Sequence, residues 1–257
     1  MRAIDAPGFD GTSVRYLRES NSTIVTAIQL IVQGSLELHH FPSQWKSAKV
    51  IPAPKLDRDT QSAKYYRPIS LLSVLGKVDE SIVKNRLTYW FESGRTLYSE
   101  QYRFKGQKSA EAALWRFISA VSLVLKQRRQ LWVASLDLRS AYDKIWHSGL
   151  LVRMARIGIP RYLILWTASF LDARTVTLCV GNAETLGRMN SGVPQGSPLS
   201  PILFMVFLDQ ILKEVSGLTN IQAFADDILL WIRVDRHHFN SQKLSLALQK
   251  LEVRAKQ

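Results

Sequence analysis

The sequence has almost no cysteine and no long apolar run. Its 257 residues include a single cysteine, Cys179, which excludes an internal disulfide and a Cys-rich zinc site. The longest apolar runs, near residues 163–171 and 202–208, fall short of the roughly 20 residues that span a bilayer. No signal peptide opens the chain. These absences predict a protein of the nucleus or cytoplasm that has no membrane partner.

Acidic residues are scarce relative to basic ones. The chain carries 34 Lys and Arg against 21 Asp and Glu, a formal net charge of +13. A basic chain of this size favours a polyanionic partner, usually a nucleic acid. A surface that merely keeps the protein soluble explains the charge alone equally well. Seven Trp and 46% hydrophobic residues indicate a globular chain with a substantial core.

Hydrophobic periodicity predicts a mixed α+β architecture, in which helices pack against a small sheet. The expected helices cover residues 20–38, 74–92, 109–127, 148–157, 160–170 and 197–215, with a last one beginning near 238. The expected strands are a buried one at 131–136 and three more at 174–180, 221–225 and 228–234. Ser197 suits a helix N-cap, and Gly94 and Gly217 suit helix ends. Residues 52–64 are expected to form an exposed loop.

Three aspartates stand next to the expected strands. Asp137 ends one apolar run, and Asp226 and Asp227 form a turn between two others. Carboxylates gathered beside buried strands repel one another unless a cation binds them. Oxygen ligands suit Mg²⁺, and two such ions about 3.5–4 Å apart can promote phosphoryl transfer. The alternative explanation is that Asp226 and Asp227 merely form a hairpin turn. The presence of Asp137 at another strand end makes this explanation the weaker one.

The segment 191–201, with sequence SGVPQGSPLSP, is the third candidate for chemistry. Gly192 and Gly196 allow the backbone to approach a ligand closely, and the Gln195 amide offers both a donor and an acceptor. The segment also leads into a helix N-terminus, which favours anions. On composition alone, an ordinary loop that caps a helix is the better explanation.

The strand ending at Asp137, the loop 192–201 and the segment 224–227 occur in the order of the three central palm motifs of a reverse transcriptase. Over roughly 40–235 the chain resembles the reverse transcriptases of non-LTR (LINE-type) retrotransposons. The segment 66–72 (YRPISLL) and the stretch 147–170 are also similar to that group.

The resemblance implies a right-hand polymerase fold with fingers and palm only and the thumb missing. It further implies an N-terminal helical segment (1–45), fingers (46–130), a palm (131–236) and the start of a truncated palm helix (237–257). Part of 174–192 is expected to pack with the fingers.

The resemblance also implies roles for individual residues. Asp137, Asp226 and the backbone carbonyl of Leu138 would bind two Mg²⁺ ions, or Mn²⁺ in their place, and Asp227 would complete the acidic site. Tyr142 would exclude a 2′-hydroxyl beneath the sugar, unless it is a plain core aromatic. The other expected nucleotide contacts are Arg103, Lys105, Arg139, Ser140, Ala141, Gln195 and Gly196. Nucleic-acid contacts are expected at Arg67 and Lys108.

The sequence departs from the family pattern in several places. Lys105 replaces an arginine that faces the triphosphate, so the bidentate fork is lost unless Arg103 compensates. The loop 55–58 also differs from the usual Lys-Pro-Gly pattern. The chain ends 30 residues after Asp227, and no endonuclease segment precedes the polymerase motifs. We therefore expect a fragment: a truncated element, a partial gene model or a decayed copy.

The expected function is RNA-directed DNA synthesis with an RNA template, a DNA primer and dNTPs. One alternative is a catalytically inert remnant that still binds nucleic acid through its basic surface. Another is a viral RNA-dependent RNA polymerase, against which Tyr142 and the Phe-Ala-Asp-Asp sequence at 224–227 argue. Protein partners are not identified by the sequence.

Overall fold

The computed structural model of this chain describes residues 6–54, 62, 65–93, 97–103, 108–138, 140–234 and 239–255; at 67, 239–241 and 253–255 it describes the backbone alone. The expectations for Gly94 and for the loop 55–58 lie outside these residues. The chain forms two compact units, each built from two separate segments. Unit 1 comprises Met1–Trp90 and Tyr142–Ser200, and unit 2 comprises Phe91–Ala141 and Pro201–Gln257.

Unit 1 is mainly helical around an aromatic core. Its helices are α1 (Val14–Arg18), α2 (Ser22–Glu37), the 3₁₀ turn η1 (Ser43–Trp45), α3 (Val74–Glu92), α5 (His147–Arg156) and α6 (Arg161–Leu171). The rings of Trp166 and Phe170, one turn apart on α6, stack at 5.7 Å, and Phe41 meets both edge-on. Burying large aromatic rings in such contacts stabilises the unit beyond simple area burial. The bounds of α2, α3, α5 and α6 confirm the helices expected over 20–38, 74–92, 148–157 and 160–170.

Unit 1 also contains a four-stranded sheet that the sequence did not predict as a sheet. Its strands are β1 (Ser47–Pro54), β2 (Tyr66–Leu71), β4 (Thr175–Val180) and β5 (Ala183–Arg188), in the order β2-β1-β4-β5. The β1 and β4 strands run parallel, and the other pairs are antiparallel. The expected exposed loop at 52–64 is wrong at its start, because residues 52–54 are part of β1 and pair with β2.

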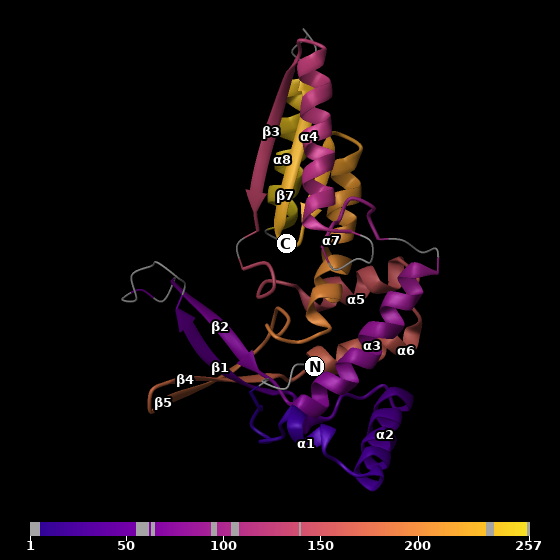
Figure 1. The fold of residues 1–257 in the computed structure, drawn as a ribbon, viewed down its shortest axis with the longest axis vertical. Helices are drawn as coiled ribbons and strands as arrows, with labels where there is room; N and C mark the ends of the chain where they lie inside the picture. The colour runs from indigo at the N-terminus through magenta and orange to yellow at the C-terminus, as the bar shows by residue number, and fades with distance from the viewer. Residues whose placement is uncertain are drawn as a thin grey trace. The chain divides into compact units, whose positions relative to one another are not determined.

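Unit 2 is a three-stranded antiparallel sheet with helices beside it. Its strands are β3 (Gln130–Asp137), β6 (Asn220–Phe224) and β7 (Asp227–Val234), in the order β3-β7-β6. Its helices are α4 (Ala110–Lys126), α7 (Ser200–Ser216) and α8 (Phe239–Ala255). Figure 1 shows α4 and α8 running alongside β3 and β7, and α8 packs on β7 while α4 contacts β3 and β6. The expected mixture of helices with a small antiparallel sheet is confirmed.

The expectation that 131–136 is a buried strand is wrong in one respect. The strand forms, but Trp132 and Val133 are 39% and 44% exposed. The physical reason is position: among the described strands β3 pairs only with β7, so it lies at the edge of its sheet. An apolar run alone does not distinguish an edge strand from a central one.

Within the described residues, no helix combines the length and the apolar character that crossing a bilayer requires.

Candidate active site

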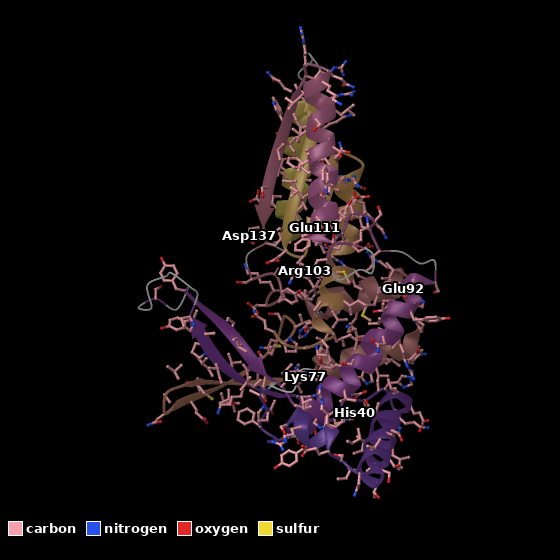
Figure 2. The ribbon with its side chains drawn as sticks, in the orientation of Figure 1. His40, Lys77, Glu92, Arg103, Glu111 and Asp137 are labelled. Carbon is pink, nitrogen blue, oxygen red and sulfur yellow. The ribbon has the colours of Figure 1, made fainter. Side chains whose placement is uncertain are left out.

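The three aspartates singled out from the sequence lie together at one end of the sheet of unit 2. The β3·β7 ladder begins at the pair Gln130↔Val234 and ends at the pair Asp137↔Asp227. Just beyond it, the Leu138 amide donates a hydrogen bond of 3.2 Å to the Asp226 carbonyl. Figure 2 shows Asp137 at the end of β3. Two apolar strands in fixed register therefore place all three residues next to one another.

The hairpin that joins β6 to β7 turns one residue earlier than expected. Phe224 pairs with Asp227, so the two-residue turn consists of Ala225 and Asp226, and Asp227 is the first residue of β7. The expected turn at Asp226 and Asp227 is therefore wrong by one residue, because the short hairpins that match strand twist have two-residue loops. Ala225 has φ +58°, a left-handed conformation that is uncommon for residues other than glycine.

The donor set suits a hard divalent cation. Asp137 and Asp227 are exposed, Asp226 is half-buried, and carboxylate oxygens are the ligands that Mg²⁺ prefers. The side chains are not gathered around one point, however. In the part of the chain that the structure describes, no group of three His, Cys, Asp or Glu side chains converges closely enough to hold a metal ion. The sheet thus brings the three backbone positions together and shows no coordination geometry.

Two cationic residues of unit 2 that were expected to contact ligands lie over aromatic rings. The Arg103 guanidinium is 5.3 Å from the centre of the Phe224 ring, and the Lys108 ammonium is 4.2 Å from that of Tyr102. Both distances are typical of cation–π contacts. Phe224 is the strand partner of Asp227, so Arg103 belongs to the immediate surroundings of the acidic turn.

The remaining expected residues of unit 2 follow β3. Ser140 is exposed and has φ +54°, and Ala141 is half-buried in the turn after it. Arg139 and Lys105 lie outside the described residues.

Unit 1 brings a second group of expected residues together. The Val193 amide donates to the Tyr142 carbonyl and the Gly192 amide to the Ile145 carbonyl, both at 2.8 Å. The Gln195 side-chain amide donates to Asp143 Oδ1 at 3.3 Å. The glycine-rich loop 191–196 therefore packs against the segment 142–145 through these hydrogen bonds. Tyr142 itself is half-buried.

Glycine is required in this loop for steric reasons. A Cβ atom on Gly192 would lie 2.6 Å from the Asp143 carbonyl oxygen, and one on Gly196 would lie 2.9 Å from that of Ser70. Both glycines also have positive φ angles, +81° and +98°. Ser70 belongs to β2, which also carries Arg67 opposite Ala53; the side chain of Arg67 is not described.

The sequence interpretation missed Glu80, which supports the end of this loop. Glu80 is 1% exposed on α3 and accepts a hydrogen bond from the Ser197 hydroxyl. The Ser197 oxygen accepts in turn from the amides of Leu199 and Ser200 at 3.1 and 3.2 Å, as a capping side chain does. Ser197 is nevertheless not the residue directly before the helix, so the expected N-cap lies too early in the sequence. The regular part of α7 then starts at Ser200.

Burial raises the pKa of Glu80 to about 7, partly offset by the Ser197 hydrogen bond. A signal for this residue was present in the sequence. Glu80 occupies one position of a stripe on α3 whose other buried members recur at helical spacing: Gly76, Val83, Leu87 and Trp90. An acidic residue on such a stripe is unfavourable unless it has a specific partner, and that partner is Ser197.

Comparison with known proteins supplies the family. The sequence model of the family described as "Reverse transcriptase (RNA-dependent DNA polymerase)" matches residues 53–257. The RNA-directed DNA polymerase from mobile element jockey of Drosophila melanogaster is 33% identical over 203 residues, which are 79% of this chain and 22% of that protein. The probable RNA-directed DNA polymerase from transposon X-element of the same species is 27% identical over 238 residues, covering 91% of this chain and 26% of that protein. The chain thus spans about a quarter of the length of these relatives.

A solved structure agrees at the level of the fold. Apo telomerase from Candida tropicalis, truncated from its C-terminal domain, matches with a TM-score of 0.55 at 14% sequence identity, covering 90% of this chain and 53% of that one. Its similarity confirms the expected polymerase fold. The sequence match over 53–257 establishes that the chain belongs to the reverse transcriptase family, as a domain related to the polymerases of non-LTR retrotransposons.

Proposed function

We propose that this chain is the catalytic domain of an RNA-directed DNA polymerase, which joins a dNTP to the 3′-hydroxyl of a DNA primer on an RNA template and releases pyrophosphate. The observation that carries the proposal is the position of Asp137, Asp226 and Asp227 at one end of a single sheet, in a chain of the reverse transcriptase family. We assign the reaction to the nucleus or cytoplasm.

Reverse transcriptases generally use divalent metal ions. We assign two Mg²⁺ ions, with Mn²⁺ as a substitute, to Asp137, Asp226 and the Leu138 carbonyl, with Asp227 completing the acidic site. Bound ions would offset the negative charge that develops on the transferred phosphate. The contribution of the chain itself is a set of hard anionic oxygens on adjacent, register-fixed strand ends.

We assign the triphosphate to the segment after β3 and to the basic residues near the acidic turn. The backbone amides of Arg139, Ser140 and Ala141 would donate to phosphate oxygens. Arg103 would supply the planar guanidinium fork that Lys105 lacks. Its position over Phe224, the strand partner of Asp227, supports this assignment.

We assign the sugar and base to Tyr142 and to the loop that carries Gln195. Tyr142 would exclude a 2′-hydroxyl, and Gln195 and Gly196 would lie against the nucleotide and the templating base. The contact between Gln195 and Asp143 supports a common role for these two segments. Arg67 and Lys108 would contact the nucleic-acid backbone.

Primer extension on an RNA template with Mg²⁺ tests the proposal. We expect the chain to incorporate dNTPs, and Asp226→Asn to reduce incorporation by on the order of 100- to 1,000-fold, because a ligand for charge stabilisation is removed. Asp172→Asn is the matched control, since Asp172 is an exposed aspartate beside α6. Equal incorporation by Asp226→Asn and the unsubstituted chain would refute the assigned mechanism.

A second candidate function is binding of nucleic acid without catalysis. It is favoured by two observations: the +13 charge and, among the described residues, the lack of a converged three-carboxylate cluster. It predicts affinity for an RNA–DNA hybrid with no extension. Incorporation above that of a variant with all three aspartates changed to alanine would reject it.

A further inference from the structure

The turn that carries Asp226 has a backbone that needs support. Ala225 adopts φ +58° although it has a Cβ atom, and residues held in this conformation persist only where surrounding contacts fix them. Ala225 is also 4% exposed, so its amide and carbonyl groups require partners within the protein. The contacts that hold Ala225 therefore bear directly on the position of Asp226.

Gln101 supplies those contacts from a segment far away in the sequence. Its side-chain oxygen accepts from the Ala225 amide at 3.2 Å, and its side-chain NH₂ lies 3.5 Å from the Ala225 carbonyl oxygen. The same oxygen accepts from the Arg103 amide at 3.2 Å. Gln101 is 2% exposed, so water does not compete for these groups.

The backbone on either side of Gln101 is itself anchored. The Ala223 amide donates to the Glu100 carbonyl and the Tyr102 amide to the Ala223 carbonyl, both at 2.9 Å. These bonds form a parallel bridge between Gln101 and Ala223, beside β6. The Tyr98 amide also donates to the Asp209 carboxylate of α7. The backbone of Gln101 is therefore held in place while its side chain reaches the turn.

The chemistry at this position requires a side chain that both donates and accepts. Ala225 offers both a donor and an acceptor, and only a side chain with both functions satisfies the two at once. Glutamate keeps the acceptor, loses the donor and buries a charge, whereas methionine has a similar length and neither function. The pair of substitutions thus separates the hydrogen bonds from the packing.

We propose that Gln101 is a positioning residue for the acidic site: its side-chain amide holds the Ala225–Asp226 turn in the conformation in which Asp226 binds a divalent cation together with Asp137. The inference rests on the proposed function for the role of the cation. It assigns no contact between Gln101 and the substrate. It also accounts for why a residue without charge or catalytic chemistry is buried next to the turn.

Mn²⁺ binding by the whole 257-residue chain tests the proposal, with free Mn²⁺ measured by electron paramagnetic resonance. We expect Gln101→Met to weaken binding by about 10- to 100-fold, the range seen when a group that orients a metal ligand is removed. Gln101→Glu should bind more weakly than the unsubstituted chain and tests the donor separately. Gln222→Met is the matched control: Gln222 is 7% exposed on β6, and its side-chain oxygen accepts no hydrogen bond from the described residues.

Hydrogen exchange at the amides of residues 224–228 provides a readout that needs neither metal nor activity. We expect faster exchange in Gln101→Met and no change in Gln222→Met. Unchanged exchange in Gln101→Met, or the same increase in both variants, would overturn the proposal, as would Mn²⁺ affinity within twofold of the unsubstituted chain. If the variants differ in hydrogen exchange and Mn²⁺ affinity as expected but the chain extends no primer, the result counts against the proposed polymerase function alone.

Discussion

Glu80 is a buried carboxyl group whose protonation is coupled to folding. Its pKa is raised from 4.5 to about 7, mainly by burial. The Ser197 hydrogen bond and the charges of Arg174 and Lys77 lower this pKa, and the charge of Asp79 raises it. A group whose pKa is raised in the folded state favours the protonated form there. Its contribution to stability is therefore complete below pH 4.5 and is lost as the pH rises through 7.

The substitution Glu80→Gln should remove this pH dependence, because glutamine stays neutral. Since one pKa unit corresponds to about 1.4 kcal/mol, the free energy of unfolding of the unsubstituted chain should fall by roughly 3 kcal/mol relative to the variant between pH 4.5 and 8. Urea unfolding followed by tryptophan fluorescence at several pH values measures this difference. Glu92→Gln, an exposed position on the same helix, is the control and should follow the unsubstituted chain. A constant difference between Glu80→Gln and the unsubstituted chain across this range would contradict the prediction.

Single residues differ in how well the sequence predicts them. Asp137, Asp226 and Asp227 were predicted because each is a charge directly beside an apolar run, a local signal. Gln101 was not, because its importance comes from hydrogen bonds to Ala225, a residue 124 positions away. No local pattern distinguishes such a glutamine from a solvated one.

The glycine-rich loop against 142–145 is a feature of whole segments, and it gives a steric prediction. Gly192→Ala should destabilise the chain by roughly 2–4 kcal/mol, because the new Cβ would meet the Asp143 backbone and φ is +81°. Thermal unfolding measures the loss.

Gly34→Ala provides a control of opposite sign. Gly34 lies inside α2, and a Cβ there meets nothing within 4 Å, so alanine should raise stability by about 0.5–1 kcal/mol. If both substitutions had the same effect, the packing described for Gly192 would be wrong.

Helices were predicted more reliably than sheets. Each helix depends on apolar spacing within its own segment. The parallel pairing of β1 with β4 joins Ser47 to Thr175, across much of the chain. Which strands become neighbours depends on such long-range packing, and the exposed edge position of β3 was missed for the same reason.

At the scale of the whole molecule, the two contact units interleave along the sequence. Each consists of two separated segments, whereas the expected N-terminal segment, fingers and palm are continuous stretches. The boundaries at 45, 130 and 236 stay a prediction. The polymerase fold itself was predictable because several motifs in a set order indicate one architecture, even where each motif alone is ambiguous.

The net charge of +13 predicts salt-dependent binding to an RNA–DNA hybrid. If about five phosphates are contacted, the logarithm of the association constant should fall with the logarithm of salt concentration with a slope of roughly −4 to −5. Fluorescence anisotropy at several salt concentrations measures the slope. A slope near zero would exclude phosphate contacts as the main source of affinity and leave the charge as a solubility feature.

The β3·β7 ladder has a consequence for which changes in chain length the protein can accept. Side chains alternate between the faces of a strand, so a slip of one residue turns every side chain to the opposite face. Asp137 and Asp227 face each other only because eight consecutive pairs connect them to Gln130 and Val234. One inserted or deleted codon within either strand would separate the two aspartates without altering either of them. Along these strands the number of residues is therefore more constrained than their identity. Insertions and deletions in β3 and β7 should thus be tested as well as substitutions.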